Sequence, residues 1–256
     1  MPRSIWNGTI AFGMVRVPVK LYTATESKTV RFHEVHAKDG ARIQHRRICP
    51  REDREVPATE VVKGFEVAPD EYVVLTKEEV KAAAGDRGKV VHLEAFVDVA
   101  EIDPVFYESS YFLGSRDDAD AYRLLHDALR RSRRAGIGRF SFHDREYLVA
   151  LRAFEGVLAL HTMRFHDEVV RGEELDMART QRRPSKRELD MANQLVEALR
   201  RDFDPSAYRD TYREAVLNLI KRKAAGQRIE PVPREEAPAE DDLTAALEAS
   251  LSSARR

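Results

Sequence analysis

The chain has 256 residues, with 43 lysines and arginines against 44 aspartates and glutamates, for a formal net charge of −1. This length allows one large domain or a core with appendages, and the single cysteine, Cys49, excludes a disulfide within the chain and favours a reducing compartment. The net charge by itself argues against a nucleic-acid partner, but the acids gather in residues 231–256, which leaves +2 for the rest. No apolar run approaches the roughly 20 residues that span a bilayer, and the N-terminus lacks the apolar core of a signal peptide, so we expect a cytoplasmic protein with no membrane contact.

The first 22 residues predict a half-buried strand. Residues alternate from position 15 to 21, with Val15, Val17, Val19 and Leu21 on one face and Arg16, Pro18 and Lys20 on the other. Ile10, Phe12 and Met14 fill the opposite face before it. The pattern is typical of an N-terminal barrel strand whose open face is basic.

Residues 1–114 as a whole favour strands. Val30–Val35 and Ala41–Ile48 are short extended candidates, and Val90–Ile102 alternates again. Tyr72–Leu75 is a strand that leads into Thr76-x-x-Glu79, a capping box for a short helix ending near Gly85.

The next segment predicts one helix and three strands. Ser115 is a candidate N-cap for a helix that Gly136 and Gly138 end. The strands are Ile137–Phe142, Glu146–Phe154 and Val157–Thr162, and Glu155-Gly156 is the hairpin turn between the last two.

From Ser185 to Gly226 the pattern is helical. Ser185-x-x-Glu188 is a capping box, and Asp204-Pro205 restarts the helix. Residues 229–242 combine prolines and acids as a linker does. The last segment carries Leu243, Leu247 and Leu251 at the spacing of one helix face, which is typical of a docking peptide.

Motifs for metal or catalytic chemistry are weak. His33, His36, His45 and Cys49 lie close in sequence, but they lack the paired thiolate spacing of a structural zinc site. The sequence has no phosphate-binding loop, nucleophile elbow or His-Glu-x-x-His motif. We therefore expect no metal, no cofactor and no catalytic residue, although an enzyme with a cryptic site stays open.

Arginine is clustered in three windows. These hold Arg42, Arg46, Arg47 and Arg51; Arg130, Arg131, Arg133, Arg134 and Arg139; and Arg179, Arg182, Arg183, Lys186 and Arg187. Such faces are often merely solvated, but three of them in a near-neutral chain favour a role in phosphate binding. Gly136 and Gly138 would let the backbone approach a phosphate. Because motifs that read bases are absent, the pattern predicts binding to a nucleic-acid backbone without sequence preference.

Several segments, in order from about residue 3 to 226, resemble bacterial Ku proteins. They are Ser4–Gly13, Val17–Tyr22, Arg31–His36, Val62–Glu66, Ile102–Tyr107, Tyr111–Gly114, Arg145–Arg152, Asp202–Pro205 and Tyr208–Tyr212. Many relatives carry a second cysteine soon after the first; Glu52 takes that place here, which weakens any inherited metal site.

The resemblance implies an α+β, mainly β fold: a Ku-type β-barrel with an inserted bridge, a C-terminal helical arm and a short tethered C-terminal helix. The expected divisions are a core at 1–184 with its bridge near 108–140, the arm at 185–228, the linker at 229–242 and a ligase-recruiting segment at 243–256.

The resemblance also implies a function. The chain is expected to form a homodimeric ring that binds double-stranded DNA ends, is nucleoid-associated, and recruits and stimulates an ATP-dependent multifunctional DNA ligase in nonhomologous end joining. The DNA-facing candidates are Arg16, Lys20, Arg42, Arg46, Arg47, Arg130, Arg131, Arg133 and Arg134, and the ligase-facing candidates are Leu243, Leu247 and Leu251. The alternatives are a lyase that acts on abasic sites near DNA ends and an adaptor that binds proteins only.

Overall fold

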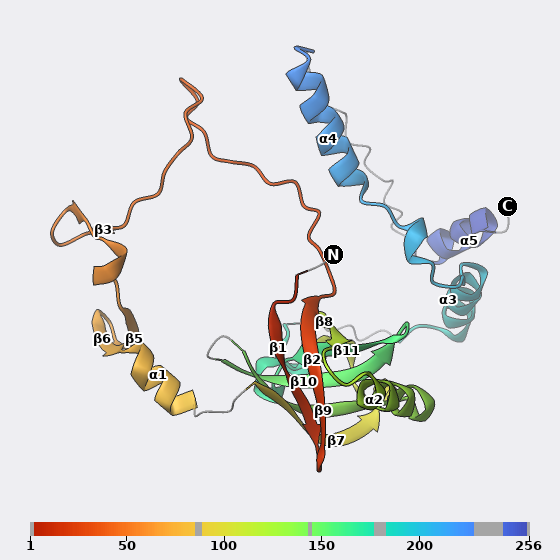
Figure 1. The fold of residues 1–256 in the computed structure, drawn as a ribbon. Helices are drawn as coiled ribbons and strands as arrows, with labels where there is room; N and C mark the ends of the chain where they lie inside the picture. The colour runs from red at the N-terminus through yellow and green to blue at the C-terminus, as the bar shows by residue number, and fades with distance from the viewer. Residues whose placement is uncertain (1–2, 85–88, 143–144, 177–182, 228–242, 255–256) are drawn as a thin grey trace. The chain divides into compact units, whose positions relative to one another are not determined.

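The computed structural model of the chain describes residues 3–84, 89–142, 145–176, 183–227 and 243–254 (Figure 1). The chain forms two compact units, one of Met1–Ser27 with His33–Glu174 and the other of Lys28–Phe32 with Leu175–Arg256. The first unit contains a closed barrel and the second contains helices, which confirms the predicted α+β, mainly β class.

The barrel has the strand order β1-β2-β8-β11-β10-β9-β7. Its strands are β1 (Trp6–Phe12), β2 (Val15–Thr23), β7 (Val90–Asp98), β8 (Tyr107–Ser115), β9 (Arg134–Phe142), β10 (Arg145–Phe154) and β11 (Val157–Met163). β1 pairs with β2 antiparallel and with β7 parallel. Consequently β2 ends, and β7 begins, at the same end of the barrel.

Alternation along the strands fills the barrel interior. Val17, Val19 and Leu21 of β2 are fully buried, as the sequence predicted, and the ring of Trp6 meets that of Phe140 edge-on at 4.9 Å. Met14 does not share a strand face, because Phe12 pairs with Val15 and Met14 lies fully exposed in the turn of a hairpin.

Helix α2 (Ala119–Ser132) connects β8 to β9 and packs against β2, β9 and β10 at the other end of the barrel. It begins after Asp118, whose side chain accepts a hydrogen bond from the Ala121 N–H at 2.8 Å. The predicted cap at Ser115 is wrong, because β8 continues to that residue. Leu125 and Leu129 of α2 join the barrel core.

The three strands predicted between residues 137 and 162 are confirmed as β9, β10 and β11. Glu155 and Gly156 form the turn of the β10–β11 hairpin, with φ of 43° and 84°. Positive φ at both turn positions matches the right-handed twist of the strands that they join.

The chain leaves the barrel between β2 and β7. This segment contains β3 (Ile48–Cys49), β4 (Arg54–Glu55), β5 (Lys63–Ala68), β6 (Glu71–Leu75) and α1 (Lys77–Ala84), and α1 begins at the predicted Thr76–Glu79 capping box. None of residues 24–76 is buried. Strands predicted at 30–35 and 41–48 are absent from the described residues there, apart from a bridge between Val35 and Arg42 and the start of β3.

The inserted bridge expected near residues 108–140 needs correction. That range forms β8, α2 and β9, and both strands belong to the closed barrel. The long insertion between barrel strands is instead residues 24–89, because strand pairing, which sequence periodicity does not reveal, places residues 108–140 within the barrel.

The second unit has three helices among its described residues: α3 (Lys186–Ala198), α4 (Thr211–Ala224) and α5 (Leu243–Ala254). The predicted capping box is confirmed, with Ser185 and Glu188 bonding each other's backbone N–H. Asp204-Pro205 begins only a single 3-10 turn, and Asp210 caps α4. α5 packs on α3, and the expected linker at 229–242 lies outside the described residues.

Candidate nucleic-acid interface

Arg16 and Lys20 lie on the outer face of β2. Their neighbours Val17, Val19 and Leu21 point into the barrel, so alternation directs both cations outward. Arg16 is exposed and Lys20 is half-buried, and neither forms an ion pair with the described residues.

Residues 40–51 carry four arginines and no acid. Arg46 contacts Glu55 at 3.4 Å, whereas Arg42 and Arg47 form no ion pair within the described part of the chain. Neither Arg46 nor Arg47 lies in a strand, so strand alternation does not direct these two side chains to opposite faces. All three are exposed, which leaves their guanidinium groups accessible to phosphate.

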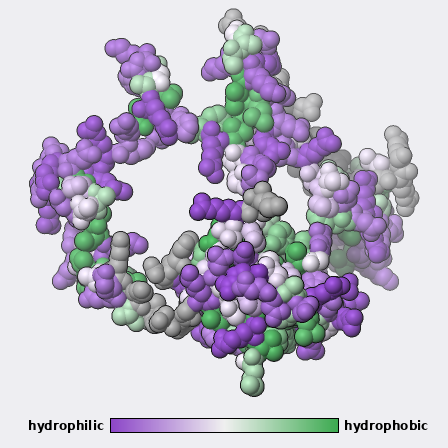
Figure 2. All heavy atoms as spheres, in the orientation of Figure 1, coloured by the Kyte–Doolittle hydropathy of each residue, from purple (hydrophilic) through white to green (hydrophobic). Residues whose placement is uncertain are grey.

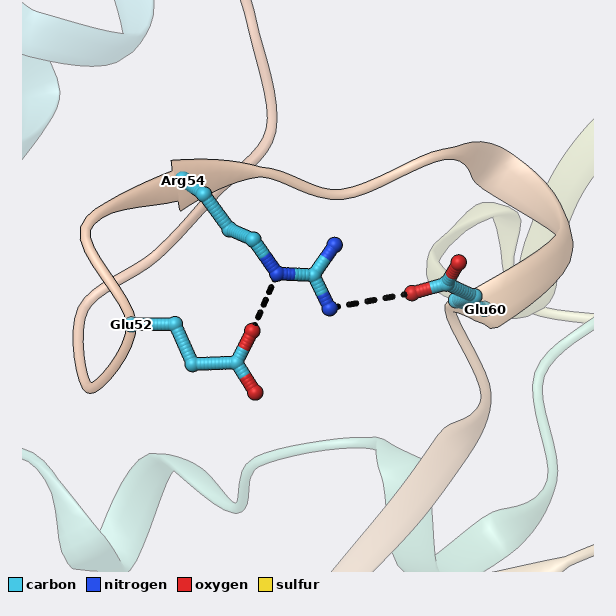
Figure 3. A network of polar contacts seen from close by, with 3 residues as sticks. All are labelled: Glu52, Arg54 and Glu60. Carbon is cyan, nitrogen blue, oxygen red and sulfur yellow. Dashed lines mark hydrogen bonds and ion pairs between the residues drawn. The ribbon is translucent and has the colours of Figure 1, made fainter.

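In the same segment, the positive charge of Arg54 is already paired with carboxylates (Figure 3). Its Nε contacts Glu52, and its Nη2 lies 3.5 Å from Glu60, so one guanidinium lies between two carboxylates. Arg54 therefore links the β3–β4 hairpin to the following 3-10 turn and is a poor candidate for phosphate binding.

The middle cluster lies where α2 ends and β9 begins. Arg130 and Arg131 are in the last turn of α2, where cations interact favourably with the helix dipole. Arg133 takes the left-handed conformation with φ of 56° and ends the helix, and Arg134 starts β9 with a 3.7 Å contact to Asp98. All four side chains are exposed.

Gly136 and Gly138 neither end the helix nor face open space. Both lie in β9, and a Cβ on Gly138 would come within 2.0 Å of the His92 carbonyl oxygen of β7. These glycines allow close strand pairing, so the interpretation that they let the backbone approach a phosphate is wrong.

The third cluster is only partly described, since residues 177–182 fall outside. Arg187 of α3 contacts Glu248 of α5 at 2.9 Å. On α5, Leu247 and Leu251 are half-buried, and the helix lies against α3. Leu243 begins α5. The leucine face predicted for a partner is thus partly covered within the second unit.

A polar cluster on β8, β10 and β11 was missed from the sequence. The Nε of Arg152 donates to Nε2 of His161 at 3.0 Å, and Nδ1 of His161 lies 2.8 Å from Oγ of Ser110. Burial, and then the positive charge of Arg152, lower the pKa of His161 from 6.5 to about 4. Alternation in β10 marks Arg152 as outward-facing, but only the strand register reveals its neighbours.

Two negative observations apply to the described residues. No helix there is long and apolar enough to cross a membrane. No group of three or more histidine, cysteine or acidic side chains in that part is placed to hold a metal: His36 contacts Asp39 and His45 contacts Glu34, each at 3.0 Å.

Comparison with known proteins identifies the barrel. The family model described as the Ku70/Ku80 beta-barrel domain matches residues 11–191. The chain is 48% identical over its full length to a non-homologous end joining protein Ku of Anaeromyxobacter sp. (strain K), and covers 87% of that protein. It is 34% identical to the protein of the same name from Bacillus subtilis (strain 168), with 99% of this chain and 83% of the relative covered. With Archaeoglobus fulgidus the identity is 35%, over 97% of this chain and 98% of the relative. The closed barrel and these matches together show that the chain belongs to the Ku β-barrel family.

Proposed function

We propose that this protein is a homodimeric ring that binds double-stranded DNA ends without sequence preference and recruits an ATP-dependent DNA ligase for nonhomologous end joining. The observation that carries the proposal is a set of exposed, mostly uncompensated arginines in a family whose relatives are named non-homologous end joining proteins. Arginine binds phosphate through two parallel hydrogen bonds, and phosphate contacts carry no sequence information.

Exposed apolar surface supports the dimer. Phe65 and Tyr72 of the β5–β6 hairpin are 68% and 56% exposed, and Figure 2 shows hydrophobic side chains at the surface of this region and of α4. In the second unit Phe203, Tyr208 and Tyr212 are 81%, 76% and 76% exposed. Aromatic side chains exposed to solvent to this extent are typical of surfaces that a second chain covers.

The insertion between β2 and β7 is the proposed bridge. Both ends of this insertion join the barrel at the same end, because β2 ends and β7 begins there. Two such insertions, one from each copy, would enclose a duplex between the barrels, and a closed ring loads only where DNA has an end.

The first experiment compares linear with covalently closed circular DNA in a gel shift. Linear duplex should bind and the circle should not, and equal binding of both would refute threading. Affinity should fall steeply with salt, since each phosphate contact adds about 0.9 to the slope of log K against log salt. Substituting Arg130, Arg131, Arg133 and Arg134 by glutamine should flatten that slope.

Ligase recruitment is tested on α5. Leu247→Asp should leave DNA binding unchanged and abolish ligase stimulation, because it places a charge on the apolar face. Ser253→Asp is the matched control, since it adds the same charge at an exposed position of the same helix. Loss of DNA binding in Leu247→Asp would contradict the separation of the two roles.

A further inference from the structure

Arg152 is held in place by uncharged groups. Its Nε donates to His161, and its guanidinium carbon lies 5.1 Å from the centre of the Phe154 ring. Phe154 in turn stacks on Phe112 of β8, with ring centres 5.9 Å apart. These contacts fix the plane of the guanidinium but do nothing to neutralise its charge.

His161 cannot supply a compensating charge. It is 8% exposed, and because its Nε2 accepts from Arg152, its proton must lie on Nδ1 and point to Oγ of Ser110. The imidazole is therefore a neutral acceptor, and the hydroxyl hydrogen of Ser110 remains available for donation. Tyr107 packs edge-on against His161 at 5.1 Å and limits its exposure to solvent.

Other arginines of the barrel differ from Arg152 because they are paired with carboxylates. Arg139 contacts Glu94 and Glu146, each at 3.1 Å, and Arg145 contacts Glu168 at 3.4 Å. Arg152 forms no ion pair with any carboxylate among the residues that the structure describes. A half-buried, oriented and uncompensated guanidinium is costly for the isolated chain, and an anion would remove that cost.

Strand register places small side chains next to Arg152. Ala159 lies between Arg152 and Phe112, and Ala150 lies beside His161. Nη1 and Nη2 remain as a planar pair of donors, the geometry that phosphate oxygens accept. Strand register places Tyr22 of β2 opposite Arg152, three strands away, and Lys20 lies two residues from Tyr22 on the same outer face.

We propose that Arg152, oriented by His161 and Phe154, is a phosphate-binding residue on the outer face of β10 that contacts a phosphodiester of the bound DNA. The proposal rests on the proposed DNA-binding function and adds a contact outside the arginine clusters. Half-buried aromatic rings beside the guanidinium favour nucleic acid over a protein carboxylate, since they exclude water next to the phosphate and offer apolar surface to the adjoining sugar.

The test measures the salt dependence of linear-duplex binding for Arg152→Gln and Arg152→Lys. Arg152→Gln removes one phosphate contact from each copy of the proposed dimer, so the slope of log K against log salt should fall by about 0.9 per copy, or about 1.8 per ring, whereas Arg152→Lys should keep it. Arg145→Gln is the matched control, because it removes another arginine of β10, one that already contacts the Glu168 carboxylate. A wild-type slope in Arg152→Gln, with wild-type protein binding DNA, overturns this proposal alone, and failure of the wild-type protein to bind DNA overturns the proposed function as well.

A second measurement uses the unmodified protein and so does not depend on how a variant folds. Phenylglyoxal should modify Arg152 in the free protein, and linear duplex should protect it, as peptide mass spectrometry would show. Modification that DNA does not change, or an Arg152 that is already protected without DNA, overturns the proposal. Light scattering adds a third outcome: a monomeric Arg152→Gln beside a dimeric wild type would assign the guanidinium to a carboxylate of the second copy and overturn the phosphate contact.

Discussion

Tyr122 joins the helix that closes the barrel to two of its strands, and its hydroxyl offers a direct test of that closure. The hydroxyl donates to the carbonyl of Leu113 on β8 and accepts from the N–H of Leu158 on β11 at 2.8 Å. Both leucines are essentially fully buried. Tyr122→Phe keeps the ring and its packing but removes both hydrogen bonds of the hydroxyl to these backbone groups, in a place that water does not reach.

The expected cost follows from those two groups. An unsatisfied buried donor or acceptor costs about 1–3 kcal/mol, and a carbonyl with a second lone pair lies at the lower end, so Tyr122→Phe should lose about 2–4 kcal/mol of unfolding free energy. For a protein of this size, each kcal/mol lowers Tm by roughly 2–4 °C, which makes a drop of about 4–16 °C.

Thermal unfolding followed by circular dichroism at 222 nm measures the shift. Tyr147→Phe is the control, because it makes the same chemical change on β10, where the hydroxyl has no hydrogen-bond partner among the described residues. The control should stay within about 0.5 kcal/mol of wild type. If Tyr122→Phe behaves like the control, α2 is not fastened to the barrel by this hydroxyl.

Three further substitutions test other parts of the barrel. Gly138→Ala should prevent barrel closure and yield insoluble protein, because its Cβ would meet the His92 carbonyl oxygen at 2.0 Å. Gly172→Ala is the control and should be soluble, because nothing lies within 4 Å of its added Cβ. A soluble Gly138→Ala protein with the wild-type Tm would contradict this prediction. His161 has a pKa of about 4 in the folded protein and near 6.5 in the unfolded chain, so between pH 4 and pH 6.5 the unfolded chain binds more protons. The free energy of unfolding is therefore retained above pH 6.5 and falls by up to about 3 kcal/mol as the pH approaches 4. Urea unfolding at pH 7 and pH 4.5 should show that loss reduced in His161→Gln, and equal losses in both proteins would refute the assignment. Asp118→Ala removes the α2 cap and should cost about 1 kcal/mol by urea unfolding, while an unchanged midpoint would mean that the capping bond contributes nothing.

Local signals in the sequence predicted individual elements well. The β10–β11 hairpin follows from two alternating runs around Glu155-Gly156, and the capping boxes at Thr76 and Ser185 mark where α1 and α3 begin. Each of these depends on residues within a few positions of one another, so the sequence contains the whole interaction.

Features that depend on distant partners were harder to predict. Helix α2 is limited to the residues between its caps, Asp118 and Arg133, because β8 extends to Ser115 and β9 begins at Arg134. The long insertion is 24–89 because β8 and β9 both pair into the barrel. For the candidate interface, the sequence located the arginine clusters but not which guanidinium is neutralised. The same limit hid Arg152, whose partner His161 is on the neighbouring strand.

The two-stranded β5–β6 sheet leaves unpaired backbone groups along both of its outer edges, unlike the closed barrel. Such edges, flanked by exposed side chains such as Phe65 and Tyr72, are templates on which another chain can add a strand and begin to aggregate. Lys63, Glu66 and Glu71 place charges along this hairpin, as gatekeeper residues do beside hydrophobic strands. In the homodimer proposed above, these three charges would keep the hairpin edges of separate copies from pairing before the two chains assemble.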